Sequence, residues 1–175
     1  MQKFIIKIEN NQPLPAGDDV CCYLADEQTD AKLVKQAAAG NLLVLGCGEN
    51  AADVCKKYNL DGAVIEIDEK QPVKKQVAAF LEKIGPKKFW GALIRPSRHI
   101  AMLAAETEPD FVAFRTDGKE SRAEDIIKWY NELFLIQSAV VFKENLADSL
   151  FNACDFVILT AGEYKILVDK IKRLD

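Results

Sequence analysis

Short apolar segments alternate with amphipathic segments along the whole chain. Eight of the apolar segments are four or five residues long, rich in β-branched and aromatic residues, and show little polar alternation. Parallel strands that are covered by helices have this character. The segments are Phe4–Ile8, Val20–Leu24, Leu42–Leu45, Ala63–Ile67, Trp90–Ile94, Phe111–Phe114, Ala139–Phe142 and Phe156–Leu159. The pattern therefore predicts an α/β protein built on a parallel sheet.

Between these segments, apolar residues recur three and four positions apart, which is the spacing of one helix face. One such stripe follows Pro72, a residue that suits the first turn of a helix. The three clearest stripes are Val73, Val77, Phe80, Leu81 and Ile84; Ile126, Tyr130, Leu133 and Phe134; and Tyr164, Leu167, Val168, Ile171 and Leu174. Asn50, Ser97 and Asn145 each stand just before a helical segment and are predicted N-caps.

The chain also contains an internal repeat. Asp110 and Asp155 directly precede a predicted strand, Asp61 stands two residues before one, and the three are 49 and 45 residues apart. The strands before them begin at Leu42, Trp90 and Ala139, at intervals of 48 and 49 residues. The repeating unit is two strands and two helices, and the two strands before Leu42 form a shortened fourth copy. Four copies supply eight strands, the number that closes a (β/α)8 barrel.

We expect a compact TIM barrel with a shortened or missing first helix. The chain has 175 residues, whereas this fold typically has about 250. The segment from Asn10 to Asp19 carries Pro13, Pro15 and Gly17 and cannot form a normal helix. The alternative is an open doubly wound sheet, which applies if Phe4–Ile8 does not join the ring. The repeat favours a barrel, with residues 1–175 as one domain.

Composition and charge narrow the function classes. Hydrophobic residues make up 49% of the chain and charged residues 29%, as in ordinary globular proteins. The net charge of -4 is opposite to that of a basic nucleic-acid-binding domain. The apolar runs are far shorter than the about 20 residues that cross a bilayer, and the N-terminal residues do not resemble a signal peptide. We therefore expect a cytoplasmic protein without a nucleic-acid or membrane partner.

The five cysteines predict buried free thiols. Their number is odd, and no pair has the C-x-x-C spacing of a zinc or redox site, so no metal site is expected. Cys47 differs because it stands between two glycines just past an apolar run. The alternative interpretation is that Cys47 is a catalytic nucleophile. His99 is the one histidine of the chain, so it is the one histidine that could serve as the base for Cys47.

The segment Arg95-Pro96-Ser97-Arg98-His99-Ile100-Ala101-Met102, followed by Asp110–Phe114, resembles the thiamine phosphate synthase family. Divergent bacterial members carry Ser-Arg-His-x-Ala-Met before Ala-Asp-Tyr-Val-Ala-Phe at this point. The resemblance covers about three quarters of the chain by the order and spacing of its strands. It implies a compact (β/α)8 barrel and, if the protein is an enzyme, a transferase of thiamine biosynthesis that joins two phosphorylated heterocycles with magnesium.

Most of the family's functional positions are changed. An arginine after the second strand is replaced by Ala25, and an Asn-Asp pair after the third by residues of Gly46-Cys47-Gly48-Glu49. The Gly-Gly phosphate loop after the seventh strand is replaced by Lys143-Glu144-Asn145, and a glycine after the sixth by Arg115. Only Gly162 remains at such a place. We therefore expect a divergent member without standard synthase activity, a pseudoenzyme whose catalytic residues are unknown, with magnesium only if synthase-like chemistry survives.

The candidate site is the mouth formed by the C-terminal ends of the strands, where barrels of this kind function. Acidic residues follow the first four strands, and basic residues follow the later ones. The acidic set is Glu9, Asp26, Glu27, Glu49, Glu66 and Asp68; the basic set is Arg95, Arg98, His99, Arg115, Lys119 and Lys143. The predicted phosphate-binding residues are Arg95, Arg98, His99, Arg115, Lys143 and Gly162.

Two interpretations of this mouth remain open. In the first, a small anionic or phosphorylated ligand lies over the helix that Ser97 begins, with Arg95 and Arg98 beside it. The rival role for these arginines is pairing with Glu66 or Asp117. In the second interpretation, the barrel is a non-catalytic scaffold or interaction protein, a homodimer included. That interpretation is favoured if the apolar residues near the mouth point inward and fill it: Val64, Leu93, Ile94 and Phe142.

Overall fold

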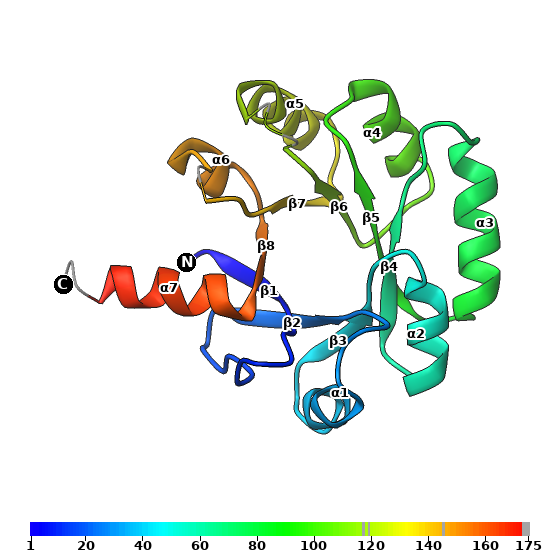
Figure 1. The fold of residues 1–175 in the computed structure, drawn as a ribbon. Helices are drawn as coiled ribbons and strands as arrows, with labels where there is room; N and C mark the ends of the chain where they lie inside the picture. Colours follow the sequence, from blue (N-terminus) through cyan, green and yellow to red (C-terminus); the bar gives the residue numbers. More distant parts are fainter. Residues whose placement is uncertain (117, 119, 145, 173–175) are drawn as a thin grey trace.

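The computed structural model describes residues 1–116, 118, 120–144 and 146–172 and forms a closed barrel of parallel strands (Figure 1). The strands are β1 (Lys3–Lys7), β2 (Val20–Ala25), β3 (Leu43–Gly46), β4 (Gly62–Glu66), β5 (Phe89–Ile94), β6 (Phe111–Phe114), β7 (Gln137–Val141) and β8 (Phe156–Thr160). Each strand pairs with its neighbours in the sequence, and β1 also pairs with β8. The closed barrel is confirmed, and the open sheet is excluded because the first strand joins the ring.

Helices surround the barrel on its outside (Figure 1). They are α1 (Ala31–Ala38), α2 (Ala51–Tyr58), α3 (Val73–Ile84), α4 (Arg98–Ala105), α5 (Glu120–Leu133), α6 (Asp148–Ala153) and α7 (Ala161–Ile171). The link from β1 to β2 has no helix, which confirms the missing first helix. Among the described residues, no helix is both long and apolar enough to cross a membrane.

The predicted helix starts need two corrections. Pro72 is the N-cap of α3 and therefore lies just before the helix, not in its first turn. Asn50 is at the N-cap position of α2, but its side chain makes no capping hydrogen bond; its amide donates instead to Glu27 at 2.8 Å. Ser97 caps α4 as predicted, since its hydroxyl accepts the backbone N–H of Ile100 at 3.4 Å. Asn145 and Leu174 lie outside the described residues.

The repeated aspartates make the same contact at three places in the ring. Each carboxylate accepts the backbone N–H of a residue at the start of the preceding strand, at 2.8 Å. The pairs are Asp61 with Val44, Asp110 with Trp90, and Asp155 with Ser138. A charged acceptor makes each of these bonds stronger than a bond between neutral groups. The sequence repeat therefore corresponds to a repeated fastening of neighbouring strands, which we call the aspartate staples.

The first unit differs in its use of the equivalent residue. Asp19 stands directly before β2, and its backbone carbonyl accepts the N–H of Phe4 at 2.8 Å. Its carboxylate accepts the hydroxyl of Tyr164, in α7, at 2.6 Å. The missing helix explains the change, because the β1–β2 link lies against α7 there. Asp19 thus connects the first and last parts of the chain.

Apolar side chains form two layers, one inside the barrel and one between the barrel and the helices. The interior cluster is Ile5, Cys22, Leu24, Leu45, Val64, Phe111, Ala113, Ala139 and Ile158, with Leu93 packed against it. Ile94 and Phe142 belong to the outer layer instead. Of the four residues that could fill the mouth, two therefore face the interior and two face the helices.

Candidate functional site at the barrel mouth

At the C-terminal ends of several strands, the inward-facing side chains change from apolar to charged. Side chains two positions apart in a strand share a face, so each of these residues continues a row that begins in the apolar interior. The rows are Ile5 to Lys7, Leu24 to Asp26, Leu45 to Cys47, Val64 to Glu66, and Ala113 to Arg115. These five rows place four charged groups and one thiol above the apolar interior, and the rows of Leu93 and Val141 continue in the same way to Arg95 and Lys143.

Two ion pairs connect the charged groups. Lys7 Nζ lies 3.2 Å from Asp26 Oδ2, between neighbouring strands. Arg115 Nη2 lies 2.9 Å from Glu66 Oε1, and this pair joins β6 to β4 past the intervening strand. The side chains of Lys7 and Arg115 are 45% and 39% exposed, so both cations remain accessible from solvent. Glu66, one of the two acids considered as a partner for Arg95 or Arg98, is thus paired with Arg115.

The Lys7–Asp26 pair is fully charged at neutral pH. Burial works to raise the pKa of Asp26, but hydrogen bonds from Lys7, Gln28 and Thr29 outweigh it and hold that pKa below its ordinary value. Burial would lower the pKa of Lys7, but Cys47, Asp26 and Glu66 raise it. Lys7 is therefore a cation at neutral pH.

Cys47 is not an activated nucleophile. Burial raises the pKa of its thiol to about 12, and the nearby carboxylate of Asp26 also raises it, whereas Lys7 lowers it. The thiolate is the reactive form of cysteine. The geometry therefore gives no support to the alternative of a catalytic Cys47, and all five cysteines of the chain are free.

We expect Cys47 to react slowly with iodoacetamide in the native protein. A thiol with a pKa of about 12 has a thiolate fraction at pH 8 roughly a thousandfold below that of an ordinary cysteine with a pKa of about 8.5. The rate should rise with pH up to at least pH 10. Mass spectrometry of peptides after timed alkylation measures it, with unfolded protein as the control; rapid native labelling at pH 7 would contradict the expectation.

The start of α7 is already occupied by groups of the chain itself. Glu9 Oε2 accepts the backbone N–H of Gly162 at 2.8 Å. Thr160 and Glu163 form a capping box at the same helix end. An anion held by a helix N-terminus uses such N–H groups, and here a carboxylate from the other end of the chain uses one. Gly162 therefore lies in the first turn of α7, just after β8, and its N–H is bound to Glu9.

The other sequence-predicted residues do not all gather at one point. Arg95 directly follows β5 and is exposed. Arg98 lies over the ring of Trp129, in α5, at 5.1 Å from the centroid, so it packs against the neighbouring helix. His99 is exposed in the first turn of α4, and Lys143 is exposed beside α7, where it lines a pocket of about 350 Å³. Asp117 and Lys119 lie outside the described residues.

Sequence reasoning missed Lys7 as a site residue. Asp26 and Glu66 were recognised only as members of an acidic set, and their partners were not assigned. The signal for Lys7 is present in the sequence, since it is a charged residue two positions after inward-facing Ile5, at the end of a strand.

The described residues contain no group of three or more His, Cys, Asp or Glu side chains close enough to hold a metal ion.

Comparison with known proteins identifies the fold. No model of a known protein family matches the sequence, and no curated protein matches it either. A solved structure from Aquifex aeolicus VF5 is similar with a TM-score of 0.59 and 12% identity, covering 92% of this chain and 84% of that chain. Two structures of tryptophan synthase from M. tuberculosis, an open form with a bound compound and a ligand-free mutant, have TM-scores of 0.57 and 0.56.

These tryptophan synthase chains are 13% identical to this one; the alignments cover 96% of this chain and 86% or 87% of theirs. Similarity at that level shows the fold alone. The comparisons also correct the resemblance to thiamine phosphate synthase, which is wrong: two of the similar barrels are tryptophan synthases, and no family model supports the other assignment. The physical reason is that strand order and spacing, which carried the resemblance, are shared by unrelated barrels.

Proposed function

We propose that the barrel binds a small anion-bearing ligand at its mouth, with Arg115 and Lys7 as the cations that contact it. One observation carries the proposal: both side chains continue inward-facing rows and remain partly exposed above the apolar interior. Function in (β/α)8 barrels is found at this end of the ring. The proposal concerns binding and is independent of any family assignment.

Both cations have unused hydrogen-bonding capacity. A guanidinium has five N–H donors and an ammonium has three, while Arg115 and Lys7 each pair with one carboxylate among the residues that the structure describes. The carboxylates hold the cations in place, so an anion would not have to order two free side chains.

The second candidate function is a non-catalytic scaffold or interaction protein. It is favoured by the bond between Glu9 and the N–H of Gly162, which leaves that N–H unavailable to a phosphate. Arg98 supports it too, because stacking on Trp129 gives that arginine a structural role. In this alternative the two ion pairs only close the top of the barrel.

We expect pyrophosphate to bind the wild-type protein saturably at millimolar concentration and Arg115→Gln to weaken this binding about tenfold. A hydrogen bond to a charged group contributes about 1.5–3 kcal/mol, and 1.4 kcal/mol corresponds to tenfold. The lower end applies because Arg115 is 39% exposed. Titration followed by NMR or calorimetry measures the change, and Lys7→Gln should weaken binding in the same direction.

Two matched controls separate the mouth from general surface charge. Arg122→Gln and Lys165→Gln each remove one exposed cation from the outer helices, α5 and α7. Both should bind pyrophosphate like the wild type. Arg95→Ala and Arg98→Ala extend the test to the two sequence-predicted arginines. If the wild type shows no saturable binding, or Arg115→Gln binds unchanged, the proposal fails and the scaffold function is preferred.

A further inference from the structure

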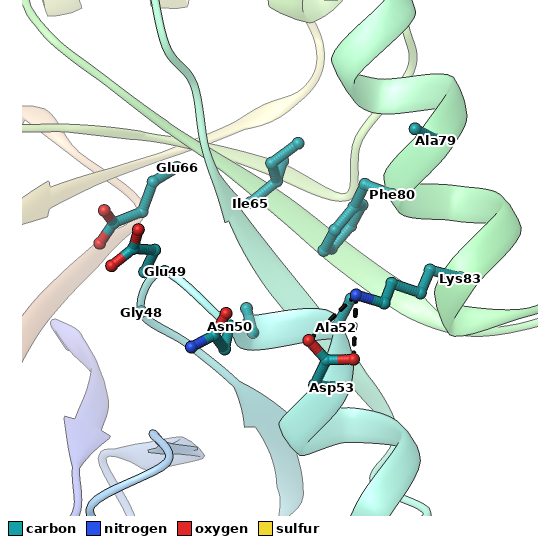
Figure 2. A pocket seen from close by; sticks show the side chains of 11 residues that line it. Gly48, Glu49, Asn50, Ala52, Asp53, Ile65, Glu66, Ala79, Phe80 and Lys83 are labelled. Carbon is teal, nitrogen blue, oxygen red and sulfur yellow. Dashed lines mark hydrogen bonds and ion pairs between the residues drawn. The ribbon is translucent and has the colours of Figure 1, made fainter.

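A separate pocket of about 340 Å³ lies outside the barrel wall, between α2 and α3 and beside the end of β4 (Figure 2). Its size falls within the range of about 300–1,000 Å³ that is usual for small-ligand sites. The loop after β3, the first turn of α2, the last two residues of β4 and one face of α3 form its walls. Because four segments build it, the pocket depends on the fold and not on one flexible loop.

Apolar groups line the middle of this pocket. Ile65 belongs to the outer apolar layer, and Phe80 of α3 is 8% exposed and also packs in that layer. In Figure 2 the two side chains lie between a pair of glutamates at one end and a lysine–aspartate pair at the other. Most of Phe80 is already covered, so the apolar surface that a hydrocarbon body would remove from water belongs mainly to half-buried Ile65 and exposed Ala79.

The charges of the pocket leave one acid uncompensated. Both carboxylate oxygens of Asp53 contact Lys83 Nζ, at 2.9 and 3.0 Å. Glu66 is paired with Arg115 at 2.9 Å. Glu49 is exposed and has no hydrogen bond or ion pair to any part of the chain that the structure describes. When Arg115 is counted with its partner, although it does not line the pocket, the sum is one negative charge, located at the glutamate end.

We propose that this pocket binds a small primary ammonium ion with an apolar body. The ammonium group would contact Glu49 and Glu66, and the hydrocarbon part would lie over Ile65 and Phe80. A single positive charge matches the single uncompensated carboxylate, and the apolar middle excludes a bare inorganic cation as the preferred ligand. The site differs from the mouth in place and in the charge it selects, and it shares only Glu66 with the mouth.

The test uses benzylammonium, with benzyl alcohol and benzoate as probes of similar shape and different charge. We expect NMR titration of the isotope-labelled protein to show saturable shifts at the amides of Glu49 and Ala52 for benzylammonium, with much weaker effects for the other two. Glu49→Gln should weaken benzylammonium binding by about fivefold, the upper end for a partly exposed ion pair. Equal binding of all three compounds, or unchanged affinity in Glu49→Gln, would overturn the proposal.

Two further variants locate the site. Glu82→Gln removes an exposed acid of the same helix α3 that does not line the pocket, and it should leave the affinity unchanged. Ala79→Leu adds bulk at an exposed position that does line the pocket, so it should reduce binding without disturbing the core. If Ala79→Leu binds normally, the ligand lies elsewhere. The two proposals can fail separately. Benzylammonium can bind this pocket even if pyrophosphate does not bind the mouth, because the variants Glu82→Gln and Ala79→Leu leave Arg115 and Lys7 unchanged.

Discussion

Gly62→Ala is expected to lower the free energy of unfolding by about 3 kcal/mol, the upper end of the usual cost of overpacking. Gly62 is the first residue of β4 and pairs in register with Phe89 of β5. A Cβ atom at this position would overlap the carbonyl oxygen of Phe89. That oxygen belongs to the backbone and cannot rotate away, so the two strands would have to separate locally.

Urea or thermal unfolding measures this change, and a loss of about 3 kcal/mol would lower the melting temperature of a chain this long by about 6–12 °C. Gly40→Ala is the matched control, because its Cβ would meet only the carbonyl oxygen of Ala37 at 3.3 Å. It should change stability by less than about 1 kcal/mol. Equal stability of the two variants would show that β4 and β5 separate without cost, contrary to the packing described.

Replacing all three staple aspartates by alanine should cost about 3–6 kcal/mol. Each single variant, Asp61→Ala, Asp110→Ala or Asp155→Ala, is expected to lose about 1–2 kcal/mol, because a backbone N–H loses its charged acceptor while the site stays partly open to water. The effects should add, since the three bonds share no partner. Domains are typically stable by only about 5–15 kcal/mol, so the triple variant should be close to unfolding at room temperature.

Denaturant unfolding of the three single variants and the triple variant tests this additivity. Asp18→Ala is the control, because Asp18 is exposed and its carboxylate contacts no hydrogen-bond partner in the described part of the chain. The Asp→Asn variants keep a neutral acceptor and should recover part of each loss. If the triple variant is as stable as the least stable single variant, the three staples do not contribute independently to the free energy of unfolding.

The barrel could be predicted because its strands are buried on both sides, which makes them almost uniformly apolar and easy to recognise. The aspartates then showed the repeat, and the repeat supplied the strand number. Helix starts are predicted less well, because a side chain at the N-cap position can form its hydrogen bond with a residue outside the helix. Asn50 illustrates this, because its amide is bound to Glu27 and not to the helix it precedes.

The site was predicted only in outline because its contacts join residues far apart in the sequence. Glu66 and Arg115 are 49 positions apart and meet only when the ring closes. Arg98 was expected beside an anion, but the rotation of α4 and the position of α5 bring it over Trp129. Strand ends indicate where charged residues gather, whereas which of them pair depends on the shape of the barrel.

The pairing of β1 with β8 has a consequence for how the protein behaves in concentrated solution. A sheet with free edges exposes unpaired N–H and C=O groups to which other chains can add, and closure of the barrel removes those edges. Segments such as Phe111–Phe114 would be aggregation-prone if exposed. The hydrogen bonds that Gly162 donates to Glu9 and Tyr164 donates to Asp19 connect the β1–β2 link to α7 beside this seam. Conditions that open the seam should therefore start aggregation before the rest of the ring unfolds.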